Sequence, residues 1–259
     1  MTIVEDKPAD IATPFGPMRT YTLRPAGEGR YPGVVMYGEI FQVTQPVRRL
    51  AATLAGHGYL VAIPEIFHEL VEAPGIVIGY DAAERGNQCK IDKELAAYDA
   101  DARAALDYLK SHPHCTGKVG AFGICIGGHL AARCAMQPDV SAAACFYATD
   151  IHKRSLGKGM NDNTLDRLKE IKGELLMIFG RQDPHVPVDG RRLIYDTLNA
   201  GNVNFTWHEF NAQHAFMRDE GHRYDPQLAR LCFDLVLDMF DRRLGANDNA
   251  SPRMDKSGC

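Results

Sequence analysis

The 259-residue chain lacks any long apolar run. No stretch approaches the ~20 consecutive apolar residues that cross a bilayer, and the first residues, MTIVEDKPAD, do not resemble a secretory signal. Basic residues form no block and the formal net charge is -4, so the basic stripe of a nucleic-acid-binding protein is absent. We therefore expect a cytoplasmic protein that binds neither nucleic acid nor a membrane.

A disulfide pattern is also lacking. The seven cysteines are odd in number and irregularly spaced, which in a chain of this size favours free thiols in a reducing compartment. His112 and His114 stand just before Cys115, and such a group can suggest a metal site. Because the group falls between a predicted helix and a predicted strand, we interpret it as a surface turn. We predict no metal and no cofactor.

Short apolar runs alternate with amphipathic segments, a pattern typical of an α/β fold. Strands are predicted at residues 18–24, 31–39, 59–65, 117–123, 140–148, 174–180 and 203–210, and helices at 43–58, 92–112, 126–137, 188–201 and 225–244. Buried strands separated by helices form mostly parallel sheets that are covered on both faces. We therefore expect one α/β domain over residues 1–244 with helices on both faces of the sheet.

Two segments do not follow this alternation. Residues 68–91 have weak periodicity and are too long for a simple connection, and long loops in compact domains are often functional. Residues 245–259 are polar, and their composition predicts a disordered C-terminal tail.

The stretch GAFGICIGG, residues 120–128, places Cys125 in a Gly-x-Cys-x-Gly-Gly pattern directly after a predicted strand. Alone, this pattern is equally typical of a tight turn before a helix. If Cys125 is a nucleophile, the sharp turn exposes its sulfur and puts the backbone N–H of Ile126 at a helix N-terminus, where it can bind a developing oxyanion. The reactive form is the thiolate, so a nearby base is then required.

An acid and a histidine follow two later predicted strands. Asp183 lies in GRQDPHVP after 174–180, and His214 lies in NAQHAF after 203–210. Taken singly, such an aspartate is usually a turn residue, and such a histidine is more often structural than catalytic. Ligands bind beyond the carboxyl ends of parallel strands, and the chain order nucleophile, acid, histidine is that of α/β hydrolases. Together the positions favour a triad in which His214 accepts the Cys125 proton and Asp183 orients the imidazole.

Five stretches resemble the dienelactone hydrolase family, carboxymethylenebutenolidase-like thiol enzymes of the α/β-hydrolase fold. The stretches are YGEIFQV (37–43), GHGYLVAIPEIF (56–67), GKVGAFGICIGGHLA (117–131), GRQDPHVP (180–187) and HEFNAQHAFMR (208–218). The resemblance implies hydrolysis of a small ester or lactone through a cysteine nucleophile and a thioester acyl-enzyme, without a cofactor.

The same resemblance implies roles for four further residues. Glu39 would lie beside the nucleophile and take part in forming the thiolate, and the N–H of Ile40 would be the second oxyanion donor. Arg218 would hold a substrate carboxylate, with Arg85 as a second such arginine. The simpler interpretations are a polar residue at a strand end for Glu39 and solvated surface charges for the two arginines.

Two departures from the family pattern concern the substrate. Glu65 stands where the family commonly has aspartate, and residues 68–91 match no pocket. A general carboxylesterase or thioesterase with the same triad remains an alternative. So does a non-catalytic protein that binds a small molecule on this fold. The sequence leaves monomer and homodimer open.

Overall fold

The structure, a computed structural model, describes residues 1–71 and 83–245. The strands are β1 (Ile3–Glu5), β2 (Ala9–Thr13), β3 (Gly16–Pro25), β4 (Tyr31–Tyr37), β5 (Leu60–Pro64), β6 (Cys115–Ile124), β7 (Val140–Phe146), β8 (Glu174–Gly180) and β9 (Phe205–Phe210). The helices are α1 (Gln45–Gly56), α2 (Ala83–Asp92), α3 (Leu95–Ser111), α4 (Ile126–Cys134), α5 (Thr164–Arg167) with the 3-10 turn η2 (Leu168–Glu170), α6 (Val188–Ala200) and α7 (Pro226–Leu244).

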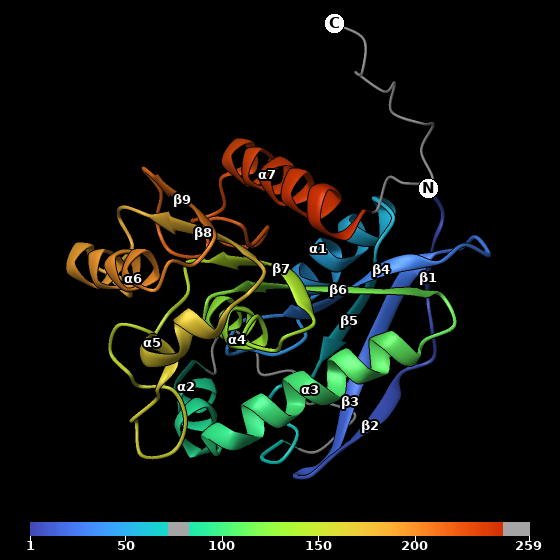
Figure 1. Cartoon of the computed structure of the whole chain (residues 1–259), viewed down its shortest axis with the longest axis horizontal. Helices are drawn as coiled ribbons and strands as arrows, with labels where there is room; N and C mark the ends of the chain where they lie inside the picture. Colours follow the sequence, from blue (N-terminus) through green and yellow to red (C-terminus); the bar gives the residue numbers. More distant parts are fainter. Residues whose placement is uncertain (72–82, 246–259) are drawn as a thin grey trace, which may run out of the picture.

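The nine strands form one sheet in the order β1-β3-β5-β4-β6-β7-β8-β9, with β2 paired to β3 off this path (Figure 1). From β5 to β9 every neighbouring pair is parallel, whereas β3 runs antiparallel to β5. The carboxyl ends of β4, β6, β7, β8 and β9 therefore lie at one edge of the sheet. This arrangement confirms the predicted mostly parallel α/β fold.

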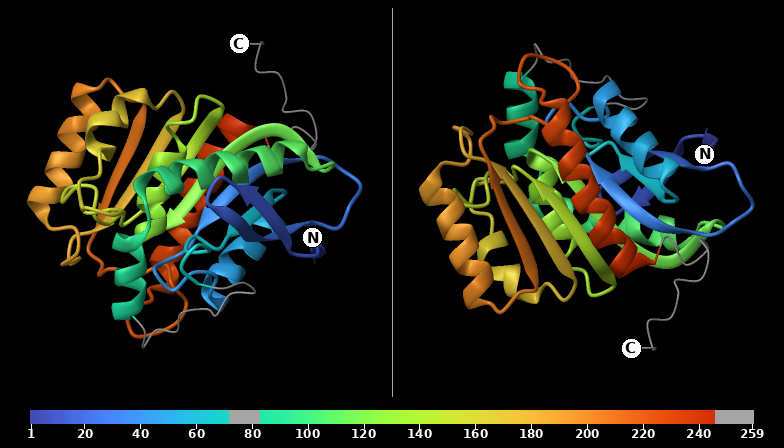
Figure 2. Two further views of the ribbon diagram at one scale, coloured as in Figure 1. Left: turned by 90° about the horizontal axis from the view of Figure 1, so that it is seen from below. Right: turned by 90° about the horizontal axis from the view of Figure 1, so that it is seen from above.

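Helices cover both faces of the sheet and divide the core into two layers. Along β4, Val34 and Met36 belong to the layer under α1 and α7, while Val35 and Tyr37 belong to the layer under α3, α4 and α6. This alternation follows from the two-residue period of a strand. Figure 2 shows α3 in front of the sheet from below and α7 in front of it from above.

The first two strands were not predicted. β1 and β2 are short, and both pair with β3. Because they are only partly buried, they need few apolar residues, and the sequence before residue 18 therefore shows no clear strand pattern. Helix α2 was not predicted either, because only Gly86 and Cys89 of its ten residues are buried. Residues 72–82 of the irregular stretch and 246–259 of the predicted tail lie outside the described residues. Over the ranges that are described, no helix is both long enough and apolar enough to cross a membrane.

Candidate active site

Cys125 lies on the turn between β6 and α4, in a conformation that side chains rarely adopt. Its backbone has φ 61° and ψ -125°, and its N–H donates to the Phe146 carbonyl at 3.1 Å. The turn is tight, since a Cβ at Gly123 would lie 1.8 Å from the carbonyl oxygen of Gly127. A Cβ at Gly127 would lie 2.3 Å from the Tyr37 carbonyl oxygen. The two glycines thus allow the strained turn to approach the end of β4.

His214 and Asp183 form a buried hydrogen-bonded pair beside this turn. The imidazole Nδ1 lies 2.7 Å from Asp183 Oδ2, and Asp183 Oδ1 accepts the His185 backbone N–H at 2.8 Å. Burial lowers the pKa of His214, but the interactions with Cys125 and Asp183 outweigh burial and raise the pKa to about 10. Burial raises the pKa of Asp183, yet the bonds from His214 and from the His185 N–H leave it below its ordinary value. The pair therefore favours a charged aspartate and an imidazole that readily takes a proton.

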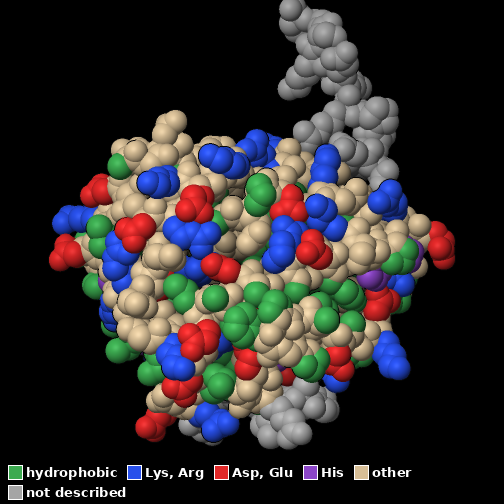
Figure 3. All heavy atoms as spheres, turned by 60° about the horizontal axis from the view of Figure 1, so that its bottom comes forward, with side chains coloured by type: hydrophobic (Ala, Val, Ile, Leu, Met, Phe, Trp, Pro, Cys, Tyr) green, Lys and Arg blue, Asp and Glu red, His purple; other side chains and the backbone are tan. Residues whose placement is uncertain are grey.

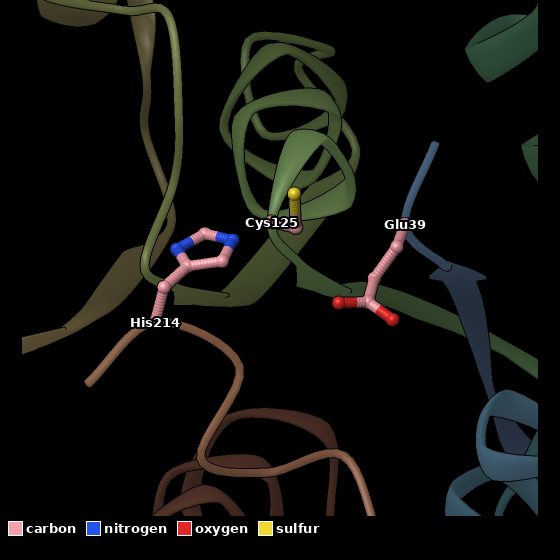
Figure 4. A group of neighbouring side chains, drawn as sticks. All are labelled: Glu39, Cys125 and His214. Atoms are coloured by element: carbon pink, nitrogen blue, oxygen red, sulfur yellow. The ribbon is translucent and has the colours of Figure 1, made fainter. Parts of the chain in front are cut away.

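The other imidazole nitrogen faces the cysteine. In Figure 4, His214 and Glu39 approach Cys125 from opposite sides, and the imidazole nitrogen that is not bonded to Asp183 points toward Cys125. Ligand atoms of these three side chains all lie within 4.8 Å of one another. The structure thus brings together the predicted residues Cys125, His214, Asp183 and Glu39.

Two aromatic rings that the sequence analysis missed hold the imidazole in place. The Tyr147 ring lies 4.8 Å from the His214 ring and the His185 ring lies 4.7 Å from it, both nearly perpendicular. Tyr147 directly follows β7, and His185 lies two residues after Asp183. Their positions at strand ends could have indicated them, but neither belongs to a motif.

Glu39 is an almost fully buried carboxylate paired with Arg218. It is 2% exposed, and Nη1 of Arg218 lies 3.3 Å from each of its oxygens. Burial raises the pKa of Glu39, while the charges of Arg218 and His214 oppose this effect. Sequence reasoning predicted both residues at the site but not their ion pair, which joins positions 179 residues apart.

The two residues whose N–H groups are predicted to bind an oxyanion lie beside the site: Ile126 directly follows Cys125, and Ile40 lines the same cavity as Cys125. Ile126 is the first residue of α4, and Ile40 follows Glu39 in the loop after β4. Gly127 holds these two segments together through its close approach to Tyr37 and Gly38. The N–H of Ile126 lies at a helix N-terminus, where negative charge is stabilised.

A cavity of about 440 Å³ opens over Cys125. Helix α2 contributes Ala83, Asn87 and Lys90 to its wall, so the irregular stretch of the sequence does form part of the site. Arg85 lies on the same helix, but its side chain is exposed and is not among the described residues that line the cavity. The structure therefore brings Arg218, but not Arg85, to the site.

A second group of metal-ligating side chains lies away from the cavity. Ligand atoms of His68, Glu69 and Asp101 lie within 4.8 Å of one another. The Lys93 ammonium lies 2.6 Å from Glu69 and 2.5 Å from Asp101, so a cation from the chain itself already pairs with both carboxylates. The His112 and His114 pair lies at the turn between α3 and β6, where His112 contacts Asp6 at 3.3 Å.

A sheet of this order, with a strained residue between a central parallel strand and a buried helix, defines the α/β-hydrolase class. Within that class, the model of the dienelactone hydrolase family matches residues 18–244, and the chain belongs to this family. It is a hydrolase.

Relatives cover nearly the whole chain. A Saccharomyces cerevisiae protein provisionally named carboxymethylenebutenolidase is 40% identical over 91% of this chain and 90% of its own length. The carboxymethylenebutenolidase of Pseudomonas sp. strain P51 is 28% identical over 83% of this chain and 86% of its own. A Klebsiella pneumoniae structure, provisionally named dienelactone hydrolase, has a TM-score of 0.78 at 22% identity, covering 93% of this chain and 100% of its own. At this low identity, the similarity to the Klebsiella pneumoniae structure shows a shared fold and nothing more.

Proposed function

We propose that this protein hydrolyses a small, carboxylate-bearing ester or lactone, dienelactone-like, with Cys125 as the nucleophile. The observation that carries the proposal is the orientation of His214. Its Nδ1 is engaged by Asp183 at 2.7 Å, and its other nitrogen faces Cys125. An imidazole oriented in this way can accept a thiol proton.

Acylation follows from this geometry. His214 takes the Cys125 proton, and the thiolate attacks the ester carbonyl carbon to form a carbon–sulfur bond. The backbone N–H groups of Ile126 and Ile40 stabilise the oxyanion. When the carbon–oxygen bond breaks, the leaving alkoxide takes the proton from His214 and leaves a thioester on Cys125.

Deacylation uses the same residues in reverse. His214 removes a proton from a water molecule, which attacks the thioester carbonyl. The tetrahedral intermediate collapses with loss of the Cys125 thiolate, and the thiolate recovers its proton from His214. The acid is released as a carboxylate, so water is the only co-reactant consumed.

The Glu39–Arg218 pair links substrate charge to this chemistry. A buried carboxylate beside a sulfur opposes a standing thiolate, so the resting thiol stays protonated and less open to oxidation. A substrate carboxylate that binds Arg218 competes with Glu39 for the guanidinium. Glu39 then becomes more basic and can help to deprotonate Cys125.

The test is a substrate panel with site variants. Wild-type protein and Cys125→Ala are assayed on a dienelactone, on p-nitrophenyl acetate and on an acyl thioester, with release of acid as the measurement. We expect the dienelactone to be turned over fastest and Cys125→Ala to be inactive on all three. A ranking led by the aryl ester or the thioester would instead identify a general esterase or thioesterase. If wild type hydrolyses none of them, the hydrolytic proposal is wrong.

A further inference from the structure

The charge inside the cavity is opposite to that of the whole chain. The chain carries a formal net charge of -4, and basic and acidic side chains are interspersed on the face drawn in Figure 3. The described residues that line the cavity include four cationic side chains but only two carboxylates. The cavity therefore concentrates positive charge, which attracts an anionic ligand.

Two of the four cations are already neutralised. Arg218 pairs with Glu39 at 3.3 Å, and Lys90 pairs with Asp150 at 3.0 Å.

The other two cations, Lys153 and Arg223, have no ion-pair partner among the residues that the structure describes. Lys153 comes from the loop after β7, and Arg223 comes from the segment between β9 and α7. Two loops that are distant in sequence thus direct unpaired positive charge into one cavity.

Lys153 and Arg223 act on a common point, the imidazole of His185. Burial lowers the pKa of His185, and the charges of His214, Arg223 and Lys153 lower it further. The His185 ring itself lies 4.7 Å from the ring of His214. Both unpaired cations therefore lie near His185, and Arg223 also lies close enough to Glu39 for its charge to lower the pKa of that carboxyl.

We propose that Lys153 and Arg223, which line the cavity near His185, form a second anion subsite, so that the preferred substrate carries two negatively charged groups. One group binds Arg218 and the other, a carboxylate or a phosphate, binds Lys153 and Arg223. This inference rests on the proposed function, because the first group is placed by the ester-cleaving geometry. It adds a second anionic group to the substrate class and assigns its recognition to Lys153 and Arg223.

The test compares two esters that differ by one negative charge. The mono-p-nitrophenyl ester of succinate is a monoanion, and that of tricarballylate is a dianion. The variant Lys153→Gln/Arg223→Gln removes both charges of the subsite. The matched control is Lys118→Gln/Arg230→Gln, which removes two exposed charges that do not line the cavity.

We expect the subsite variant to lower the ratio of kcat/KM for the dianionic ester to that for the monoanionic ester about 10-fold, as two partly solvated charge pairs would. The control variant should leave this ratio within about twofold of the wild type, and 0.5 M salt should shrink the effect by screening. An equal loss on both esters, or an equal change in the control variant, would overturn the subsite.

A binding measurement separates this proposal from the proposed function. Calorimetric titration with tricarballylate and with the monoanion butyrate needs no turnover. If wild type hydrolyses neither ester, the proposed function is wrong. The subsite is then tested by the calorimetric affinities alone. We expect tricarballylate to bind the subsite variant about 10-fold more weakly than the wild type, with a smaller change for butyrate, which has a single carboxylate. Equal tricarballylate affinities for both proteins would overturn the subsite.

Discussion

Replacement of Asp183 by asparagine tests the proposed orientation of the histidine with almost no change in shape. Asp183 accepts two hydrogen bonds, from the His185 backbone N–H at 2.8 Å and from His214 Nδ1 at 2.7 Å. An asparagine has only one oxygen. If its NH₂ group faced the His185 N–H, two donors would meet inside the protein. The amide oxygen therefore stays on His185, and the NH₂ group points at His214.

This orientation gives His214 the wrong tautomer. Nδ1 must then accept a hydrogen bond, so the nitrogen facing Cys125 carries the proton and cannot take another. Restoring the productive tautomer loses a charge-assisted bond and leaves a buried donor unpaired, which together cost about 3–6 kcal/mol. We therefore expect Asp183→Asn to lower kcat by roughly 10²- to 10⁴-fold while KM changes little.

Steady-state hydrolysis of p-nitrophenyl acetate measures this effect, with thermal melting to show that the variant is folded. Asp189→Asn is the matched control. It makes the same chemical change a short distance further along the chain, on α6, where the Asp189 side chain is 91% exposed. The control should retain wild-type kcat. A folded Asp183→Asn enzyme with kcat within tenfold of the wild type would refute the assignment of Asp183 as the group that orients His214.

Three further predictions concern the nucleophile, its turn and the charge pair. The interactions of His214 with Cys125 and Asp183 raise the pKa of His214 to about 10, so the imidazole readily takes a proton from Cys125. Iodoacetamide should therefore alkylate Cys125 faster at pH 7 in the wild type than in His214→Ala. Equal rates at pH 7 would contradict this coupling. Gly127→Ala places a Cβ 2.3 Å from a backbone oxygen and should lower stability by at least ~3 kcal/mol in urea unfolding, whereas Gly56→Ala, with its nearest atom at 3.6 Å, should not. Arg218→Ala should raise KM for carboxylate-bearing esters far more than for neutral esters, and an equal rise on both would remove its proposed role.

The regular elements could be predicted where burial produces a strong pattern. The parallel strands from β4 to β8 are almost wholly buried, so each is a recognisable apolar run. β1, β2 and α2 pack through only a few residues each, and their sequences carry little information about where they lie. Helix α2 therefore depends on tertiary contacts, such as the close approach of Gly86 to the Ile40 carbonyl. Such contacts between distant residues cannot be predicted from the local sequence.

The candidate site divides in the same way. Cys125, Asp183 and His214 follow strand ends in a known order, so sequence position alone could bring them together. The ion pair of Arg218 with Glu39 depends on how two loops 179 residues apart meet. The rings around His214 and the unpaired cations Lys153 and Arg223 likewise come from loops whose geometry is set by tertiary packing rather than by local sequence.

The backbone of Cys125 has a consequence for the evolutionary history of the chain. Its φ of 61° and ψ of -125° lie in the mirror image of the extended region, which glycine occupies freely but which costs other residues about 1–3 kcal/mol. Selection for stability alone would thus replace Cys125, the proposed nucleophile, by glycine, a change that one base substitution in either cysteine codon produces. On the proposed function, the chemistry of the sulfur is the selective advantage that offsets this cost. A lineage released from that selection would pass in one step to a more stable protein that still binds its ligand and no longer cleaves it.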